Sequence, residues 1–138
     1  MVQATPFLLV LFLALGAHSV STENVPSGCS LTGCWVNDLG SNMTITTMNV
    51  NGDFTVIYHT TVSATTNKIE ESPLQGSQHL PNPLSQPTFG FTIHWSFSES
   101  ITVFTGQCFV DKDGKEVLKT MWLLRSHADK LRNNWNAT

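Results

Sequence analysis

Apolar and polar side chains alternate strictly along residues 89–98. The apolar positions are Phe89, Phe91, Ile93, Trp95 and Phe97, and the positions between them hold Gly, Thr, His and Ser. Because successive side chains of a strand point to opposite faces, this period of two predicts a β-strand with one apolar face. It is the clearest secondary-structure signal in the chain.

Shorter apolar runs bounded by turn residues predict the other strands. We expect them at residues 33–37, 43–50, 54–60, 101–110 and 115–125. A weaker strand is expected at 69–78, where Pro73 favours an edge or irregular position. Asn51-Gly52 is the strongest short hairpin signal. Seven strands joined by hairpins predict a meander, which closes into a barrel or forms a sandwich.

The last predicted strand, residues 115–125, is apolar on both faces. Leu118, Trp122 and Leu124 share one face, and Val117, Met121 and Leu123 share the other. One face must pack inward, so the other is expected to meet another subunit.

The segments between and after the strands also carry signals. Residues 62–68 and 79–87 are expected to be loops, and the first could fold over a ligand. Beyond the last strand, Ser126 and Asp129 have the spacing of a capping box, which predicts a short helix toward Trp135.

The beginning of the chain is expected to be a secretory leader. Residues 7–17 form an apolar run too short to span a bilayer. Small residues at Ala17 and Ser19 predict cleavage near Ser19 or Ser21, although no Lys or Arg precedes the run. We therefore expect a signal peptide at 1–21 and a secreted domain at 22–138, with no membrane span.

Sequons occur at Asn42-Met43-Thr44 and at Asn136-Ala137-Thr138, and we expect the glycan at Asn42. The formal net charge is -3 with 12% charged residues, and no basic cluster is longer than residues 130–132. This charge distribution excludes a nucleic-acid partner.

Three cysteines, Cys29, Cys34 and Cys108, lie in what would be an oxidising compartment. Three single bridges are possible from the sequence, and each leaves one thiol over. A bridge from Cys29 to Cys108 would close the longest loop, which stabilises by about 4–5 kcal/mol in the chain-entropy model.

Four tryptophans in so short a chain suggest a ligand cavity. Trp95 and Trp122 each precede another apolar side chain two residues on, a pattern that lines a cavity with flat apolar walls. Core filling is the alternative, above all for Trp35. Uncharged hydrogen-bonding side chains accompany the tryptophans, and they would suit a ligand with several neutral donors and acceptors: Asn37, Ser41, Tyr58, Thr60, Thr65, Ser98, Ser100 and Thr102.

Several long motifs together resemble the avidin family. They are Cys29-Ser30-Leu31-Thr32-Gly33-x-Trp35-x-Asn37-Asp38-Leu39-Gly40-Ser41-Asn42-Met43-Thr44, Glu71-Ser72-Pro73-Leu74, Gln86-Pro87-Thr88-Phe89-Gly90-Phe91-Thr92, Phe97-Ser98-Glu99-Ser100, Val103-Phe104-Thr105-Gly106-Gln107-Cys108-Phe109, and the run from Gly114 to Ser126. The resemblance covers essentially all of residues 29–138. It implies an all-β fold, an antiparallel up-and-down β-barrel of the avidin/streptavidin type with eight strands, about seven of them present here.

The resemblance also implies a ligand, biotin, and a role for each matching residue. Asn37, Ser41 and Tyr58 would donate to the ureido oxygen, Thr60 would accept from a ureido nitrogen, and Thr102 would meet the thioether sulfur. Ser63, Ala64, Thr65, Ser98 and Ser100 would meet the carboxylate. Trp95, Phe97, Phe104 and Trp122 would form an aromatic box, completed by Trp135 of a neighbouring subunit, and Leu39, Val62 and Leu124 complete the binding set.

The same resemblance implies a Cys29–Cys108 disulfide, a glycan at Asn42, and a homotetramer with Met121 at a subunit contact. It implies no catalytic residue, no metal and no cofactor besides biotin as ligand. Two departures stand out. Cys34 replaces a non-cysteine residue and is expected to face outward, where it could link two chains. The sequence stops at Thr138, before the family's eighth strand, which leaves the first and last strands as open edges, so the chain is either a fragment or a weakened binder.

The sequence argues against three other functions. Enzyme chemistry is disfavoured because the histidines show no metal-ligand spacing, no nucleophile elbow occurs, and His59 and His94 are expected to face outward. A lipocalin-like carrier of an apolar ligand would not need so many polar side chains. An immunoglobulin-like sandwich would place a tryptophan between paired cysteines, but Trp35 follows Cys29 too closely for that pattern.

Overall fold

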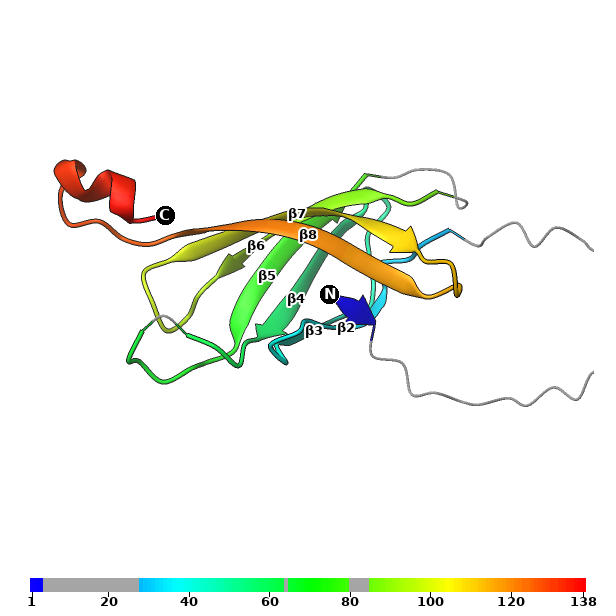
Figure 1. Ribbon diagram of the computed structural model, residues 1–138, viewed down its shortest axis with the longest axis horizontal. Coiled ribbons are helices and arrows are strands. Elements are labelled where there is room, and N and C mark those ends of the chain that lie inside the picture. Colours follow the sequence, from blue (N-terminus) through cyan, green and yellow to red (C-terminus); the bar gives the residue numbers. More distant parts are fainter. Residues whose placement is uncertain (4–27, 64, 80–84) are drawn as a thin grey trace, which may run out of the picture.

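The computed structural model describes residues 1–3, 28–63, 65–79 and 85–138, and its strands form one antiparallel ring. Each strand pairs with its neighbours in the chain, and the first pairs with the last. The strands are β1 (Val2–Gln3), β2 (Gly33–Val36), β3 (Asn42–Ile45), β4 (Asp53–His59), β5 (Ser72–Gln78), β6 (Thr88–His94), β7 (Ile101–Val110) and β8 (Glu116–Arg125). Figure 1 shows β2 to β8 and the N-terminal strand. The prediction of an antiparallel up-and-down barrel is confirmed.

The interior of the barrel follows the alternation seen in the sequence. Phe89, Phe91 and Ile93 of β6 are buried, and the residues between them are intermediate or exposed. On β4 the same pattern buries Phe54 and Tyr58. These side chains join one core cluster of apolar residues. A strand with one apolar face gains stability by turning that face inward, which positions the intervening residues outside.

The interpretation of residues 69–78 as an edge or irregular strand is wrong. β5 lies inside the sheet and pairs with β4 on one side and β6 on the other. Pro73 is tolerated because it is the second residue of the strand and its pairing with β6 begins only at Leu74. A proline at the start of a strand interrupts little of the ladder.

Three turns between strands share one design. Asn37, Asn49 and Asp111 each accept, through side-chain Oδ1, the backbone N–H groups of the residues two and four positions later at 2.8–3.0 Å. In each turn the third residue after it is a glycine with a φ of 77–86°, a conformation that side chains with a Cβ disfavour. The Asn51-Gly52 signal therefore belongs to this longer turn and not to a two-residue hairpin.

β1 bridges the two ends of the ring. Val2 pairs with Val36 of β2 and with Val117 of β8, and the Met1 amino group donates to the Leu118 carbonyl oxygen at 2.8 Å. The strand belongs to the residues expected to form the leader. Over this short stretch of the unprocessed chain, an extended tripeptide satisfies the backbone groups of both edges, and the prediction of open edges is wrong there. For the domain without residues 1–21, open edges stay a prediction.

The C-terminal segment forms a short 3₁₀ helix, η1 (Leu131–Asn136), beyond the end of β8 (Figure 1). The predicted capping box at Ser126 is wrong. The Ser126 N–H donates to the Ala137 carbonyl oxygen, Lys130 precedes the helix, and no side chain caps it. Asp129 instead faces His127, with 3.5 Å between Oδ1 and Nε2.

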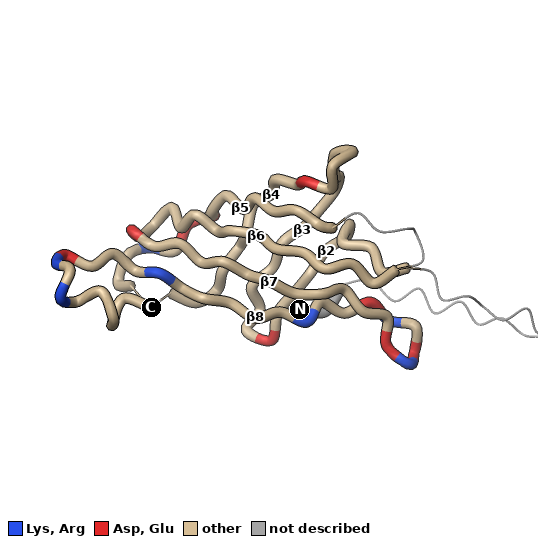
Figure 2. Tube along the Cα trace, turned by 90° about the horizontal axis from the view of Figure 1, so that it is seen from above, with Lys and Arg blue, Asp and Glu red and all other residues tan. Residues whose placement is uncertain are grey.

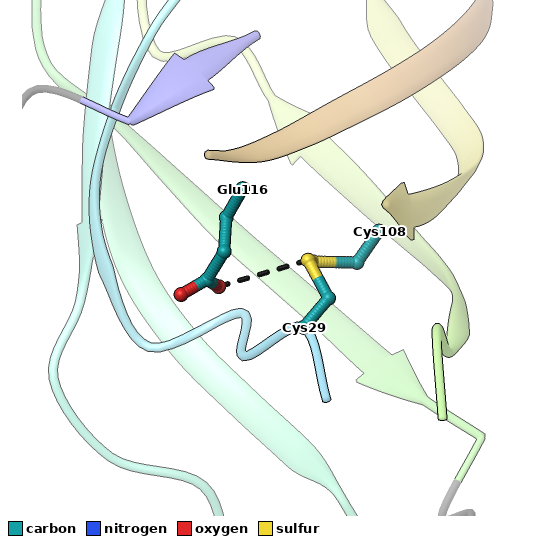
Figure 3. Close-up of side chains that lie close together, drawn as sticks. All are labelled: Cys29, Cys108 and Glu116. Carbon is teal, nitrogen blue, oxygen red and sulfur yellow. Dashed lines mark hydrogen bonds between the residues drawn. A yellow bond between two sulfur atoms is a disulfide. The ribbon is translucent and has the colours of Figure 1, made fainter. Parts of the chain in front are cut away.

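A disulfide joins Cys29 to Cys108 with 5.6 Å between the Cα atoms, as the resemblance implied, and Cys34 stays free. Figure 3 shows Glu116 beside this bridge, with its Oε2 atom 3.6 Å from Cys29 Sγ. A disulfide sulfur carries no proton, so this contact is not a hydrogen bond. The Glu116 carboxylate accepts instead from the Ser30 N–H at 2.7 Å. Because both sulfurs are bonded to each other, this cluster offers no thiolate to a metal.

Most Lys, Arg, Asp and Glu residues lie in the turns and end segments, and most residues of the strands are uncharged (Figure 2). Among the described residues, no helix combines the length and the apolar character needed to cross a membrane.

Candidate functional site

A cavity of about 380 Å³ lies within the barrel. It is lined by strand residues that point inward and by residues of two loops, at 60–63 and 65 and at 97–100. The lining comprises Asn37, Leu39, Ser41, Tyr58, Thr60, Val62, Ser63, Thr65, Trp95, Phe97, Ser98, Ser100, Thr102, Phe104, Trp122, Leu124 and Ser126. A cavity of this size suits one small ligand.

Asn37 has its orientation set by the turn in which it lies. Its Oδ1 atom accepts from the N–H groups of Leu39 and Ser41, both at 3.0 Å. The Nδ2 group is thereby turned toward Tyr58 and donates to its phenol oxygen at 3.4 Å. Tyr58 Oη accepts this bond, so its own proton is available to the cavity. Two donors therefore converge at one point of the wall.

Ser41 and Thr60 complete this polar wall. Ser41 is buried, and its hydroxyl oxygen accepts from the Thr61 N–H at 3.1 Å. Thr60 donates to the Val62 carbonyl oxygen at 2.9 Å, so toward the cavity Thr60 acts as an acceptor. Three donors beside one acceptor are complementary to a carbonyl oxygen with an N–H group next to it, as in a urea or amide.

Aromatic rings form the apolar walls. Tyr58 and Trp95 meet edge to face with 5.8 Å between centroids, and Trp95 and Phe97 lie 5.6 Å apart. The Trp95 indole N–H donates to the buried Thr102 hydroxyl at 2.8 Å, which fixes the plane of the indole ring. Rings held in this way offer flat contact surface with little conformational entropy to lose on binding.

Trp122 is 61% exposed although it lies on the inward face of β8. The reason is the short reach of β1, which pairs with β8 only at Val117. Over the rest of β8, the described residues place no strand beside this edge. The cavity is therefore open along the side on which Trp122 stands.

Two loops surround the mouth of the cavity and are tied to each other. The Thr65 N–H donates to the Ser63 hydroxyl at 3.0 Å, which stabilises a tight bend. Asn67 Nδ2 donates to the Phe97 carbonyl oxygen at 2.7 Å and joins the two loops. Ser98 and Ser100 are hydrogen-bonded to each other within the second loop. The mouth thus carries neutral hydroxyl groups.

Burial raises the pKa of the Tyr58 phenol above its ordinary value, and a hydrogen bond with Ser41 opposes this effect. Burial dominates because a phenolate loses more solvation energy than a phenol in this environment. Tyr58 consequently keeps its proton, and its function as a donor, at every pH below about 10.

The cavity contains the residues that the sequence analysis assigned to binding, with two exceptions. Ala64 lies outside the described residues. Trp135 is 80% exposed on η1 and does not line this cavity. Sequence reasoning missed Ser126, although it continues the inward alternation of Trp122 and Leu124, because the capping-box interpretation had assigned it to a helix.

The exposure of the other predicted residues is also clear. His59 and His94 face outward and are exposed, as predicted, and His59 lies 3.2 Å from Glu71. Met121 is 75% exposed on the outer face of β8. Fold and cavity together define the class of small antiparallel β-barrels with an interior the size of one small ligand.

Comparisons with known proteins agree with this class. The chain matches the Avidin family over residues 25–138. Avidin of Gallus gallus is 58% identical over 141 residues, covering 100% of this chain and 90% of that protein. Avidin-related protein 4/5 of Gallus gallus is 57% identical over 131 residues, covering 95% of this chain and 83% of that protein.

Solved structures give the same result. The crystal structure of xenavidin has a TM-score of 0.75 at 53% identity and covers 79% of this chain and 89% of its own. The X-ray structure of a biotin binding protein from chicken has a TM-score of 0.75 at 51% identity, covering 79% and 88%. The chain belongs to the Avidin family, whose members are binding proteins and not enzymes.

Proposed function

We propose that this protein is a secreted biotin-binding protein that sequesters biotin in the barrel cavity. The observation that carries the proposal is the convergence of Asn37, Ser41 and Tyr58 donors beside the Thr60 acceptor. The ureido group of biotin has the complementary pattern, one carbonyl oxygen flanked by two N–H groups. Neutral donors held in advance around one oxygen act like an oxyanion hole used for binding.

The remainder of the ligand follows from the other walls. The bicyclic rings and the alkyl arm lie between Trp95, Phe97, Phe104 and Trp122, and the thioether sulfur lies near Thr102. The carboxylate meets the hydroxyl groups at the mouth, from Ser63, Thr65, Ser98 and Ser100, together with the backbone at Ala64. Leu39, Val62 and Leu124 supply further apolar contact.

The proposal extends to processing and assembly. Residues 1–21 are a signal peptide, residues 22–138 form the secreted domain, and Asn42 carries a glycan. Four copies associate, with the exposed Met121 at a subunit contact and the exposed Trp135 reaching the cavity of a neighbour. An aromatic side chain that is 80% exposed loses unfavourable hydration when a partner covers it.

Isothermal titration of the secreted protein tests this function. Three ligands are compared: biotin, an analogue of biotin blocked at the ureido oxygen, and retinoic acid. We expect heat with biotin, much weaker binding of the blocked analogue, and none with retinoic acid. Heat with retinoic acid alone would identify a carrier of apolar ligands instead. A folded protein that binds none of the three would contradict the proposal.

A further inference from the structure

A second cavity, of about 530 Å³, lies on the outside of the barrel next to the first. Ser98, Ser100 and Ser126 line both cavities. These serines therefore form the boundary across which a ligand in the barrel could continue into the outer cavity. No residue of the proposed aromatic box lines this outer space.

The strand register determines the floor and walls of the outer cavity. His94 of β6 pairs with Ile101 of β7, which pairs with Arg125 of β8. The three side chains stand in one row on the outer face, so Ile101 forms the floor between His94 and Arg125. Adjacent strands are about 4.8 Å apart, which places the two flanking strands about 10 Å from each other.

Charges of both signs line this cavity. Arg125 contributes a permanent cation, and its Nη1 group donates to the Asn134 carbonyl oxygen at 3.4 Å, which leaves other guanidinium donors available. Glu99 contributes a carboxylate from the loop between β6 and β7. His127 lies between two acids, with Nδ1 3.7 Å from Glu99 and Nε2 3.5 Å from Asp129.

We propose that the outer cavity is a second subsite, which binds an amino acid joined through its side-chain amine to the carboxyl arm of the ligand. The inference rests on the proposed binding of biotin in the barrel. The arm leaves the barrel past Ser98 and Ser100, the α-carboxylate of the attached amino acid meets Arg125, and its α-ammonium group meets Glu99. The linker lies over Ile101.

In the outer cavity, the chemistry favours a zwitterion over a purely anionic group. Forming the amide removes the charge of the carboxyl arm, so the neutral serines at the boundary need not neutralise a carboxylate. An anion alone would be attracted by Arg125 and repelled by Glu99, whereas a zwitterion satisfies both. The charges are exposed to solvent, so each contact is worth a small factor in affinity and weakens with salt.

Competition binding to the complete secreted protein tests the subsite with three ligands. Free biotin reports on the barrel cavity, biocytin carries the zwitterionic lysine, and the pentylamide of biotin has a comparable arm without charges. We expect biocytin to bind about 2- to 10-fold more tightly than the pentylamide at low salt. The ratio should approach one in 0.5 M salt.

Arg125→Gln and Glu99→Gln should each reduce the ratio of biocytin to pentylamide affinity toward one and leave pentylamide binding unchanged. Lys112→Gln is the matched control, because it removes an exposed charge from the turn at the other end of β8. A biocytin preference that persists in Arg125→Gln, or is absent from the wild type while biotin binds, overturns the subsite alone. Failure of biotin itself to bind overturns the proposed function and the subsite together.

Discussion

Replacing Asn37 by Asp would separate the two roles of this side chain. The Oδ1 atom accepts from the backbone of the turn, and the Nδ2 group faces Tyr58 and the cavity. An aspartate oxygen can accept the same two backbone bonds, as Asp111 does in the corresponding turn between β7 and β8. The substitution should therefore preserve the turn and remove one donor from the cavity.

The expected loss of biotin affinity follows from that donor. A hydrogen bond lost in a buried site costs about 1–3 kcal/mol, which is about 5- to 150-fold in Kd. The second carboxylate oxygen also brings negative charge toward the ureido oxygen, so the result should lie in the upper part of this range. Asn37→Ala would lose the donor and the turn together, and its melting temperature should fall as well.

The pH dependence of the Asn37→Asp variant provides a second readout. The backbone N–H of Lys115, followed by that of Asp113, holds the pKa of Asp111 below its usual range. The carboxyl group introduced at position 37 has equivalent donors, so its pKa should also lie below the ordinary value of about 3.9. As the pH falls through that pKa, the oxygen facing the cavity gains a proton and donates again. Affinity should partly recover below about pH 4, and only in the variant.

Competition titration against labelled biotin, together with thermal melts, measures both effects. Asn49→Asp is the control, since Asn49 caps the same kind of turn and does not line the cavity. The reasoning is refuted if the two aspartate variants lose affinity equally. It is also refuted if the Asn37→Asp variant binds as the wild type does.

Three further predictions address other parts of the molecule. Thr102→Val leaves the Trp95 indole N–H without its acceptor and should lower the free energy of unfolding, measured in urea, by about 1–3 kcal/mol. As a control, substitution of the exposed Thr92 by Val should change the free energy of unfolding by less than about 0.5 kcal/mol. Equal losses in the two variants would contradict a stabilising role for the bond between Trp95 and Thr102. Burial raises the pKa of Tyr58, so biotin affinity should stay constant up to about pH 10 and fall above it as the phenol loses its donor proton. A decline of affinity centred below about pH 9 would show that another group controls binding. Cys34 is the free thiol and is partly exposed, so a non-reducing gel should show a chain dimer that Cys34→Ser abolishes, and a band of single chains alone would exclude the link.

Alternation predicted the central strands well because it reflects a local property of the backbone. Phe89, Phe91 and Ile93 face inward for the same geometric reason that makes their neighbours face outward. Phe89, Phe91 and Ile93 pack in the core, and farther along the same alternation Trp95 and Phe97 line the cavity. Most of the other lining residues were implied by the resemblance to the avidin family, because periodicity alone does not say which inward side chains meet a ligand.

Predictions that depend on distant partners were less successful. Pro73 indicates only a missing N–H, and whether a strand lies at an edge is decided by neighbours elsewhere in the chain. The capping-box pattern at Ser126 was satisfied in sequence, but the Ala137 carbonyl competes for the Ser126 N–H in the folded chain. β1 was missed because residues 1–3 had been assigned to a leader.

While residues 1–21 are still part of the chain, the junction made by β1 has a consequence for the order of folding. The hydrogen bond from Met1 to Leu118 spans 117 positions, whereas the hairpins of the ring join strands close in sequence. Closing a long loop costs chain entropy before any native contact can offset that cost. We therefore expect the β1 junction to form last during folding and to open first. Burial also lowers the pKa of the Met1 amino group, and its protonation below about pH 8 should weaken the junction further. The Leu118 N–H donates to the Met1 carbonyl oxygen, so its hydrogen exchange should be among the fastest in the sheet. Acidifying the solution should increase the exchange rate at Leu118, whereas the base-catalysed exchange of an unprotected amide slows as the pH falls.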